Sequence, residues 1–120
     1  RVLFRSYMAP EQVLGQQVTP LVDVYAFGIL LFELLSGAKP IVGDTVERIF
    51  NQILYEPLNL EPLRAAGIPQ PLIDLVGQCT AKQPAQRMQG FTAVCAVLER
   101  ILESPSLATG AQPGGRVSTP

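Results

Sequence analysis

The feature that most constrains this chain is an apolar segment from Val24 to Leu35, interrupted only by Glu33. Thr19 can cap a helix before this segment, Pro20 suits a first helical position and Gly37 suits the end. Because such a helix carries apolar side chains on every side, other elements must surround it to remove them from water. The segment is also shorter than the roughly 20 residues that span a bilayer. The sequence therefore predicts one buried central helix, from about Thr19 to Leu35.

Three further segments have the apolar spacing of helices. One runs from Asp44 to Tyr55, where Asp44 and Glu47 are spaced as a capping box and the polar face indicates a surface position. The others run from about Pro71 to Ala81 and from about Thr92 to Glu103, and a short helical piece ends at Gly67. No segment alternates as a strand does, so the predicted fold is all-α, with these helices packed around the central one.

The two ends of the chain differ from its middle. Residues Arg1 to Ser6 read as an in-frame translation of a sequencing-library adapter, and we exclude them from the fold; an ordinary loop is the alternative. From Ser104 to Pro120 the chain is rich in Pro, Gly, Ser and Thr and has no apolar period, which predicts a disordered linker. The predicted folded part is residues 7–103.

The composition excludes several kinds of site. The chain has no histidine and no Cys-x-x-Cys, so we expect neither a zinc site nor histidine acid–base chemistry. Cys79 and Cys95 fall on apolar stripes, and we expect both in the core. A net charge of −1 predicts no nucleic-acid partner, and no membrane segment is predicted. We expect a cytoplasmic location, with an anchor beyond Pro120 left open.

Three motifs occur in a defined order. They are Tyr7-Met8-Ala9-Pro10-Glu11-Gln12, then Asp23-Val24-Tyr25-Ala26-Phe27-Gly28, then Pro84-Ala85-Gln86-Arg87. Together they resemble the protein kinase superfamily, and most closely the bacterial serine/threonine kinases, in the C-terminal part of the large lobe. The resemblance covers Tyr7 to about Leu102. Any one tripeptide recurs by chance, but three motifs in order on the expected elements are specific.

The first and third motifs each hold one charge that needs a partner. Glu11 lies beside a helix-starting proline in an apolar context, and Arg87 can offer a bidentate fork that Lys could not. The resemblance implies that Glu11 and Arg87 form an ion pair, which ties the Ala9-Pro10-Glu11 end of the activation segment to the late helices. Two unrelated surface charges are the alternative.

The resemblance also implies roles for the remaining motif residues. Asp23 matches the aspartate that holds the catalytic loop on the buried helix, although simple helix capping is the alternative reading. Gly28 is part of the same structural motif. Tyr7 and Met8 match the segment that lies beside the substrate, but the usual upstream Gly-Thr is missing. The helix from Asp44 to Tyr55 matches a docking helix of many kinases, with ordinary packing as the alternative.

Phosphoryl transfer requires a Gly-rich loop, a strand Lys, a catalytic Asp and metal-binding Asn and Asp residues, and none of these motifs occurs in the chain. We therefore assign no catalytic, cofactor-binding or metal-binding residue to it and expect it to be inactive alone. The parent protein is expected to phosphorylate protein Ser or Thr with ATP and magnesium, and its partners would be its own N-terminal kinase part and a protein substrate. The rival interpretations are a catalytically dead kinase-like scaffold and an unrelated helical interaction domain.

Overall fold

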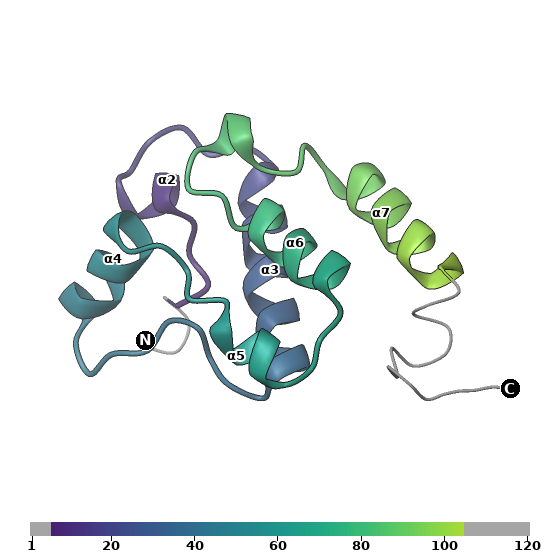
Figure 1. The fold of residues 1–120 in the computed structure, drawn as a ribbon. Helices are drawn as coiled ribbons and strands as arrows, with labels where there is room; N and C mark the ends of the chain where they lie inside the picture. Colours follow the sequence, from purple (N-terminus) through teal and green to yellow (C-terminus); the bar gives the residue numbers. More distant parts are fainter. Residues whose placement is uncertain (1–5, 105–120) are drawn as a thin grey trace, which may run out of the picture.

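A computed structural model describes residues 6–104 of this protein (Figure 1). Within that range all regular structure is helical and no strand occurs, which confirms the predicted all-α class. The α-helices are α2 (Pro10–Val13), α3 (Leu21–Ser36), α4 (Val46–Tyr55), α5 (Glu61–Ala65), α6 (Gln70–Cys79) and α7 (Phe91–Glu103), and a 3₁₀ turn spans Pro84–Gln86. No helix in residues 6–104 is long and apolar enough to cross a membrane.

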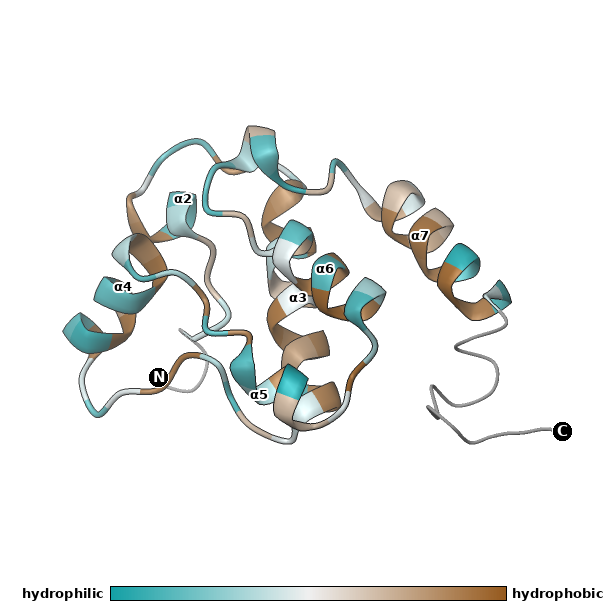
Figure 2. Cartoon of the chain, viewed as in Figure 1, coloured by the Kyte–Doolittle hydropathy of each residue, from teal (hydrophilic) through white to brown (hydrophobic). Residues whose placement is uncertain are grey.

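The central position predicted for the apolar helix is correct, because α3 contributes to three separate groups of buried side chains. Figure 2 shows that most of α3 is hydrophobic, whereas α4 is hydrophilic over much of its length. Tyr25 and Ile29 pack with α2 and α4, Val24 packs with α6 and α7, and Phe32 packs with α5 and α6. The shared apolar surface holds the other helices around α3. The three groups together contain Ala9, Val24, Tyr25, Ile29, Phe32, Ile41, Ile49, Ile53, Leu63, Ile73, Leu75, Val76, Cys79 and Val94.

Helix α3 passes close to the C-terminal end of α6 at Gly28. A Cβ atom added at Gly28 would lie 2.6 Å from the Thr80 side chain and 2.8 Å from the Cys79 Cβ. Both distances are shorter than ordinary van der Waals contact, so a side chain at this position would force the two helices apart. The glycine of the second motif therefore has a packing reason that is visible in the structure.

One expectation about α3 was wrong. The helix is not buried on every side: Leu30 is 45% exposed and Leu34 is 72% exposed. Asp23 is also exposed and occupies the same side, since residues 23, 30 and 34 repeat at helical spacing. No described helix covers this stripe of α3, so its apolar character exceeds what residues 6–104 can bury.

Helix ends show a second set of differences. Helix α4 begins after Thr45, whose hydroxyl accepts the Arg48 backbone N–H at 3.2 Å, so the expected cap at Asp44 was wrong. Asp44 instead pairs with the Arg48 side chain on the surface. Helix α3 begins at Leu21, two residues after Thr19, and α6 ends at Cys79, before Ala81. Side-chain donors and acceptors near a helix start compete for the cap, and the pattern alone does not select among them.

The two cysteines have different environments. Cys79 is buried, as expected, whereas Cys95 is exposed on α7, which corrects the expected core position. Cys95 follows Val94, the residue of that turn that α7 does bury, and so points away from α3 and α6. The proposed adapter, except Ser6, and the predicted linker, except Ser104, lie outside the described residues, and both stay predictions.

Candidate functional site

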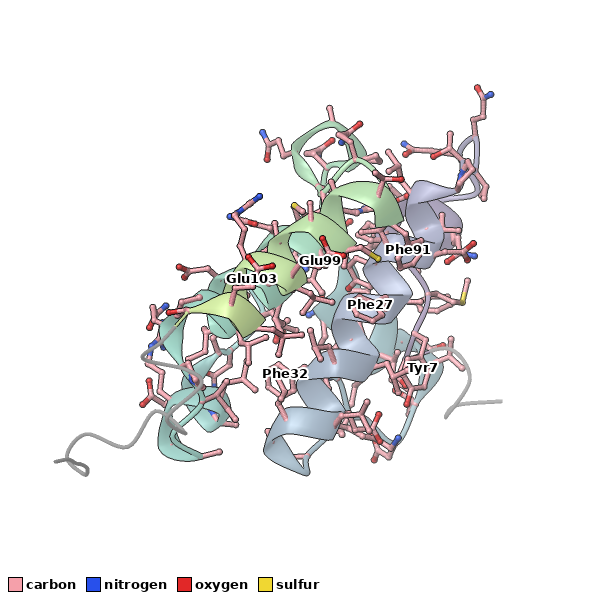
Figure 3. All side chains as sticks on the ribbon, turned by 90° about the vertical axis from the view of Figure 1, so that its right-hand side faces the viewer. Tyr7, Phe27, Phe32, Phe91, Glu99 and Glu103 are labelled. Carbon is pink, nitrogen blue, oxygen red and sulfur yellow. The ribbon has the colours of Figure 1, made fainter. Side chains whose placement is uncertain are left out.

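Residues 7–11 lie against α3, and Figure 3 shows Tyr7 beside this helix. Contacts near both ends of α3 hold the segment. Ala9 is fully buried in the group that includes Tyr25 and Ile29, and Tyr7 and Met8 pack against the same group. The Ala9 backbone N–H donates to the Gln12 side chain at 2.8 Å, which orders the start of α2. The first sequence motif thus forms one packed strip along the central helix.

Near the N-terminal end of α3, Arg87 and Glu11 form the predicted pair. The Arg87 Nη1 and Nη2 atoms donate to the two Glu11 carboxylate oxygens at 2.7 and 3.0 Å, a bidentate arrangement. Arg87 also donates to three backbone carbonyls, those of Leu21, Ala81 and Lys82, at 3.0, 2.9 and 3.2 Å. All five guanidinium N–H groups therefore have an acceptor.

This pair is almost completely removed from solvent. The side chains of Arg87 and Glu11 are 0% and 4% exposed. Burial alone would raise the pKa of the Glu11 carboxyl, but the Arg87 hydrogen bonds, a backbone hydrogen bond and the Arg87 charge outweigh burial and hold that pKa below its ordinary value. The guanidinium also lies 5.2 Å from the centre of the Tyr25 ring. Arg87 thus joins α2, the start of α3 and the loop after α6.

Tyr25 belongs to the same buried region through its ring. Burial raises the pKa of its hydroxyl to about 12, although the nearby Arg87 charge acts in the opposite direction. The phenol therefore stays neutral at any physiological pH. Its role here is to pack beneath the guanidinium, and this stacking was not predicted from the sequence.

Asp23 is not part of this buried pair. Its side chain is exposed, and no hydrogen bond or ion pair joins its carboxylate to another of the described residues. It lies in the first turn of α3, where the helix dipole stabilises a negative charge. The structure thus separates the predicted site residues: Ala9, Pro10, Glu11 and Arg87 are brought together, Gly28 lies at the α3–α6 crossing, and Asp23 faces outward beside Leu30 and Leu34.

Near the C-terminal end of α3, a second charged group holds the same strip. The Tyr7 hydroxyl donates to Glu33 Oε1 at 2.5 Å, and Lys39 Nζ donates to Glu33 Oε2 at 2.9 Å. Lys39 also lies 3.5 Å from the Tyr7 hydroxyl and 5.5 Å from the centre of its ring. These contacts lower the pKa of Glu33, chiefly through Tyr7, and raise the pKa of Lys39, chiefly through Glu33.

Sequence reasoning missed the Tyr7–Glu33–Lys39 group. Residues 7, 33 and 39 come from three different local segments, so no spacing pattern connects them. The one available signal was Glu33 itself, the single charged residue inside an otherwise apolar run. A charge at such a position requires a partner or an exit to solvent.

A third connection links α4 to the loop that precedes Arg87. Lys82 Nζ donates to the backbone carbonyls of Ile53 and Gln52 at 2.7 and 3.3 Å, so it caps the C-terminal end of α4. Burial lowers the pKa of the Lys82 amine. Because Lys82 also offers its carbonyl to Arg87, a single residue connects α4 to the buried ion pair.

The outer face of α4 borders an open groove of about 510 Å³, lined by Val42, Gly43, Glu47, Arg48, Asn51, Gln52 and Glu56. The lining is mixed, with acidic, basic and amide side chains. Among residues 6–104 there is no group of three or more His, Cys, Asp or Glu side chains placed to hold a metal ion. The described residues around the first sequence motif are closely packed, with Ala9 fully buried.

Comparison with known proteins finds one matching family and several similar proteins. Residues 1–102 match the protein kinase domain family. The chain is 36% identical over 117 residues to the serine/threonine-protein kinase PknL of Mycobacterium tuberculosis, covering 94% of this chain and 28% of that protein. It is 38% identical over 82 residues to the serine/threonine-protein kinase PkaA of Streptomyces coelicolor, covering 68% of this chain and 14% of that protein.

The similarity extends beyond bacteria. Protein kinase C-like 2 of Schizosaccharomyces pombe is 37% identical over 83 residues, which is 69% of this chain and 8% of that protein. The chain therefore spans less than a third of the length of each of these curated relatives. The family match at residues 1–102 includes all three sequence motifs.

Proposed function

This chain belongs to the protein kinase superfamily, and on that basis we propose that it is the C-terminal part of the large lobe of a serine/threonine protein kinase. The parent protein would transfer the γ-phosphate of ATP to Ser or Thr hydroxyls of a protein substrate. The names of the bacterial relatives support the Ser/Thr preference. The role of this part would be structural: it anchors the end of the activation segment.

The observation that carries the proposal is the buried Glu11–Arg87 pair. It joins two residues far apart in the sequence through two hydrogen bonds, with nearly all of both side chains removed from water. A buried ion pair with every guanidinium donor in use defines one geometry, because any displacement leaves a charge uncompensated. Glu11 ends the first motif, so the pair fixes that motif relative to α3 and the loop after α6.

The exposed stripe of α3 supports the second part of the proposal, namely that an upstream part of the same kinase domain is the missing partner. Leu30 and Leu34 leave a large apolar area uncovered on an otherwise central helix, and Asp23 stands at the end of the same stripe. We assign this stripe to contact with that upstream part, including the catalytic loop. Asp23 would accept hydrogen bonds from that loop.

Nucleotide and magnesium belong to the parent in this proposal. The described residues do not fit either group, since they hold no cluster of metal ligands and the chain has no Gly-rich phosphate loop. No step of phosphate transfer is therefore assigned to a residue of this chain.

The test is to recover the coding sequence on both sides of the segment, purify the complete protein and measure phosphate transfer from ATP to matched Ser, Thr and Tyr peptides. We expect transfer to Ser or Thr by the complete protein and none by the 120-residue chain. Transfer to Tyr alone would contradict the assigned preference. A complete protein that transfers no phosphate but binds a protein partner would support the rival scaffold function instead.

A further inference from the structure

Lys39 is held in place by the loop that follows α3. Gly37 adopts a left-handed conformation, with φ of 77°, and turns the chain back after the helix. The Ser36 hydroxyl then bonds the backbone N–H and carbonyl of Ala38 at 3.0 and 3.1 Å. Two residues after Lys39, Ile41 enters the core beside α4. The Lys39 backbone is thus fixed on both sides, which limits where its side chain can reach.

The Lys39 ammonium group contacts both Tyr7 and Glu33, whose mutual hydrogen bond holds the first motif against α3. It donates to Glu33 and lies within reach of the Tyr7 hydroxyl, with its charge above the Tyr7 ring. Glu33 is therefore held from two sides, by a neutral phenol and by a cation. Without Lys39, the Glu33 carboxylate would keep one partner among the described residues and could turn toward solvent.

Tyr7 connects this charged group to the segment expected to face the substrate. Its ring packs against the buried group that includes Ala9, and its hydroxyl is the polar anchor that joins residues 7–9 to the C-terminal half of α3. A shift of Glu33 would release this anchor but leave the buried Ala9 side chain in place. The expected consequence is a local loosening of the backbone of residues 7–9, which includes the hydrogen bond from the Ala9 backbone N–H to the Gln12 side chain.

We propose that Lys39 is a positioning residue that orders the Tyr7–Ala9 segment by holding Glu33 against the Tyr7 hydroxyl. The part of this inference that concerns the substrate rests on the proposed kinase function. The part that concerns the order of the segment does not, since it follows from the contacts alone.

The partial exposure of this group predicts a local effect. The Lys39 and Glu33 side chains are 34% and 27% exposed, and ion pairs at such positions contribute little to global stability. A purely structural role for Lys39 would change the unfolding of the whole domain. A positioning role would change only the segment that Glu33 and Tyr7 hold.

The first experiment measures amide hydrogen exchange by NMR on the 120-residue chain, with the Ala9 amide as the reporter. In Lys39→Met, we expect exchange at Ala9 to increase roughly two- to five-fold, the range open to an exposed ion pair, while amides of α6 and the melting temperature stay unchanged. Lys39→Arg keeps the cation and should stay close to wild type. Arg64→Met, which breaks the exposed Arg64–Glu61 pair of α5, is the matched control and should leave Ala9 unchanged.

The second experiment uses the complete kinase and compares steady-state kinetics of the same variants. Lys39→Met should raise KM for a peptide substrate by a similar factor and leave KM for ATP unchanged, and Lys39→Arg should restore the peptide KM. Unchanged exchange at Ala9, or faster exchange across all helices, overturns the positioning role. Faster exchange at Ala9 with an unchanged peptide KM overturns its extension to the substrate. A wild-type protein without kinase activity overturns the proposed function, whereas the exchange result still decides what Lys39 does to Tyr7.

Discussion

Contacts near the two ends of α3 both hold residues 7–11, and each includes a carboxylate paired with a cation. One contact is buried and the other is partly exposed. Near the N-terminal end, Glu11 of the segment is buried against Arg87, and every guanidinium donor has an acceptor. Near the C-terminal end, Tyr7 of the segment meets Glu33 and Lys39 at a partly exposed position. Both contacts join a carboxylate to a cation at less than 3 Å.

Burial makes the difference between these two contacts. A buried charge that loses its partner cannot recover hydration, so breaking the Glu11–Arg87 pair affects the whole fold. A charge at the surface is hydrated as soon as its partner leaves, so breaking the Glu33–Lys39 pair affects local order only. The Glu11–Arg87 contact therefore contributes to the stability of the whole fold, whereas the Tyr7–Glu33–Lys39 contact determines only the local order of the segment.

The largest effect is expected when the buried end is broken. Arg87→Ala should lower the free energy of unfolding by roughly 3–5 kcal/mol, because Glu11 is left as an uncompensated buried carboxylate. Chemical denaturation of the 120-residue chain measures it. Arg87→Lys is the matched control, since it keeps the charge but cannot form the bidentate fork, and it should fall between Ala and wild type. A loss below 1 kcal/mol in Arg87→Ala would show that the pair is not buried in solution.

A substitution at Gly28, in the middle of α3, tests whether this helix must stay close to α6. Gly28→Ala should destabilise the chain by about 1–3 kcal/mol, because the new Cβ would meet Thr80 and Cys79 inside contact distance. Gly77→Ala in α6 is the control: its Cβ would meet only Leu60, at 3.8 Å, so the better helix propensity of Ala should stabilise by about 0.5–1 kcal/mol. Equal effects of the two substitutions would refute the close crossing.

At the N-terminal end of α3, removing the exposed Asp23 carboxylate should affect stability much less than breaking the buried Glu11–Arg87 pair. Asp23→Ala should change the unfolding free energy of this chain by less than about 1 kcal/mol, since its carboxylate interacts mainly with the helix dipole. In the complete kinase it should reduce turnover much more than ATP affinity, because the catalytic loop would lose its anchor. Asp74→Ala, at another exposed position, is the control for both measurements. Unchanged turnover in Asp23→Ala would remove the role proposed for Asp23.

The smallest effect on stability is expected in mild acid, which should distinguish the buried Glu11 carboxylate from the partly exposed Glu33 carboxylate. The Glu11 pKa is lowered in the folded chain, so the unfolded chain binds the proton more readily and stability is lost as pH falls. The loss sets in around pH 4.5, the ordinary value for a Glu carboxyl, and grows as the pH falls toward the lower pKa of the folded chain. The Glu33 pKa is lowered as well, so its contribution has the same sign.

The measurement is denaturation between pH 7 and pH 3 for the wild type, Glu11→Gln and Glu33→Gln. Glu11→Gln should flatten the acid-side slope more than Glu33→Gln does, because Glu11 is held by the buried guanidinium. Parallel profiles for wild type and Glu11→Gln would mean that the Glu11 pKa is ordinary in the folded chain.

Several features could be predicted from the sequence because they follow from local pattern. The apolar run from Val24 to Leu35 required a central helix, and apolar spacing located α4, α6 and α7 to within a few residues. The Glu11–Arg87 contact was implied by the resemblance of the three motifs to protein kinases, and the need to pair a charge in an apolar context agreed with it. These inferences depend on periodicity and on the chemistry of single residues, which a sequence states directly.

Only the tertiary structure decided the features that depend on which surfaces meet. The full burial of Arg87 needs carbonyls from Leu21, Ala81 and Lys82, and the Tyr7–Glu33–Lys39 group needs three segments to converge. The exposure of Leu30, Leu34 and Cys95 likewise could not be read from their apolar character. A sequence specifies what each side chain prefers, whereas burial and pairing are decided by the neighbours that the fold supplies, and these lie far away along the chain.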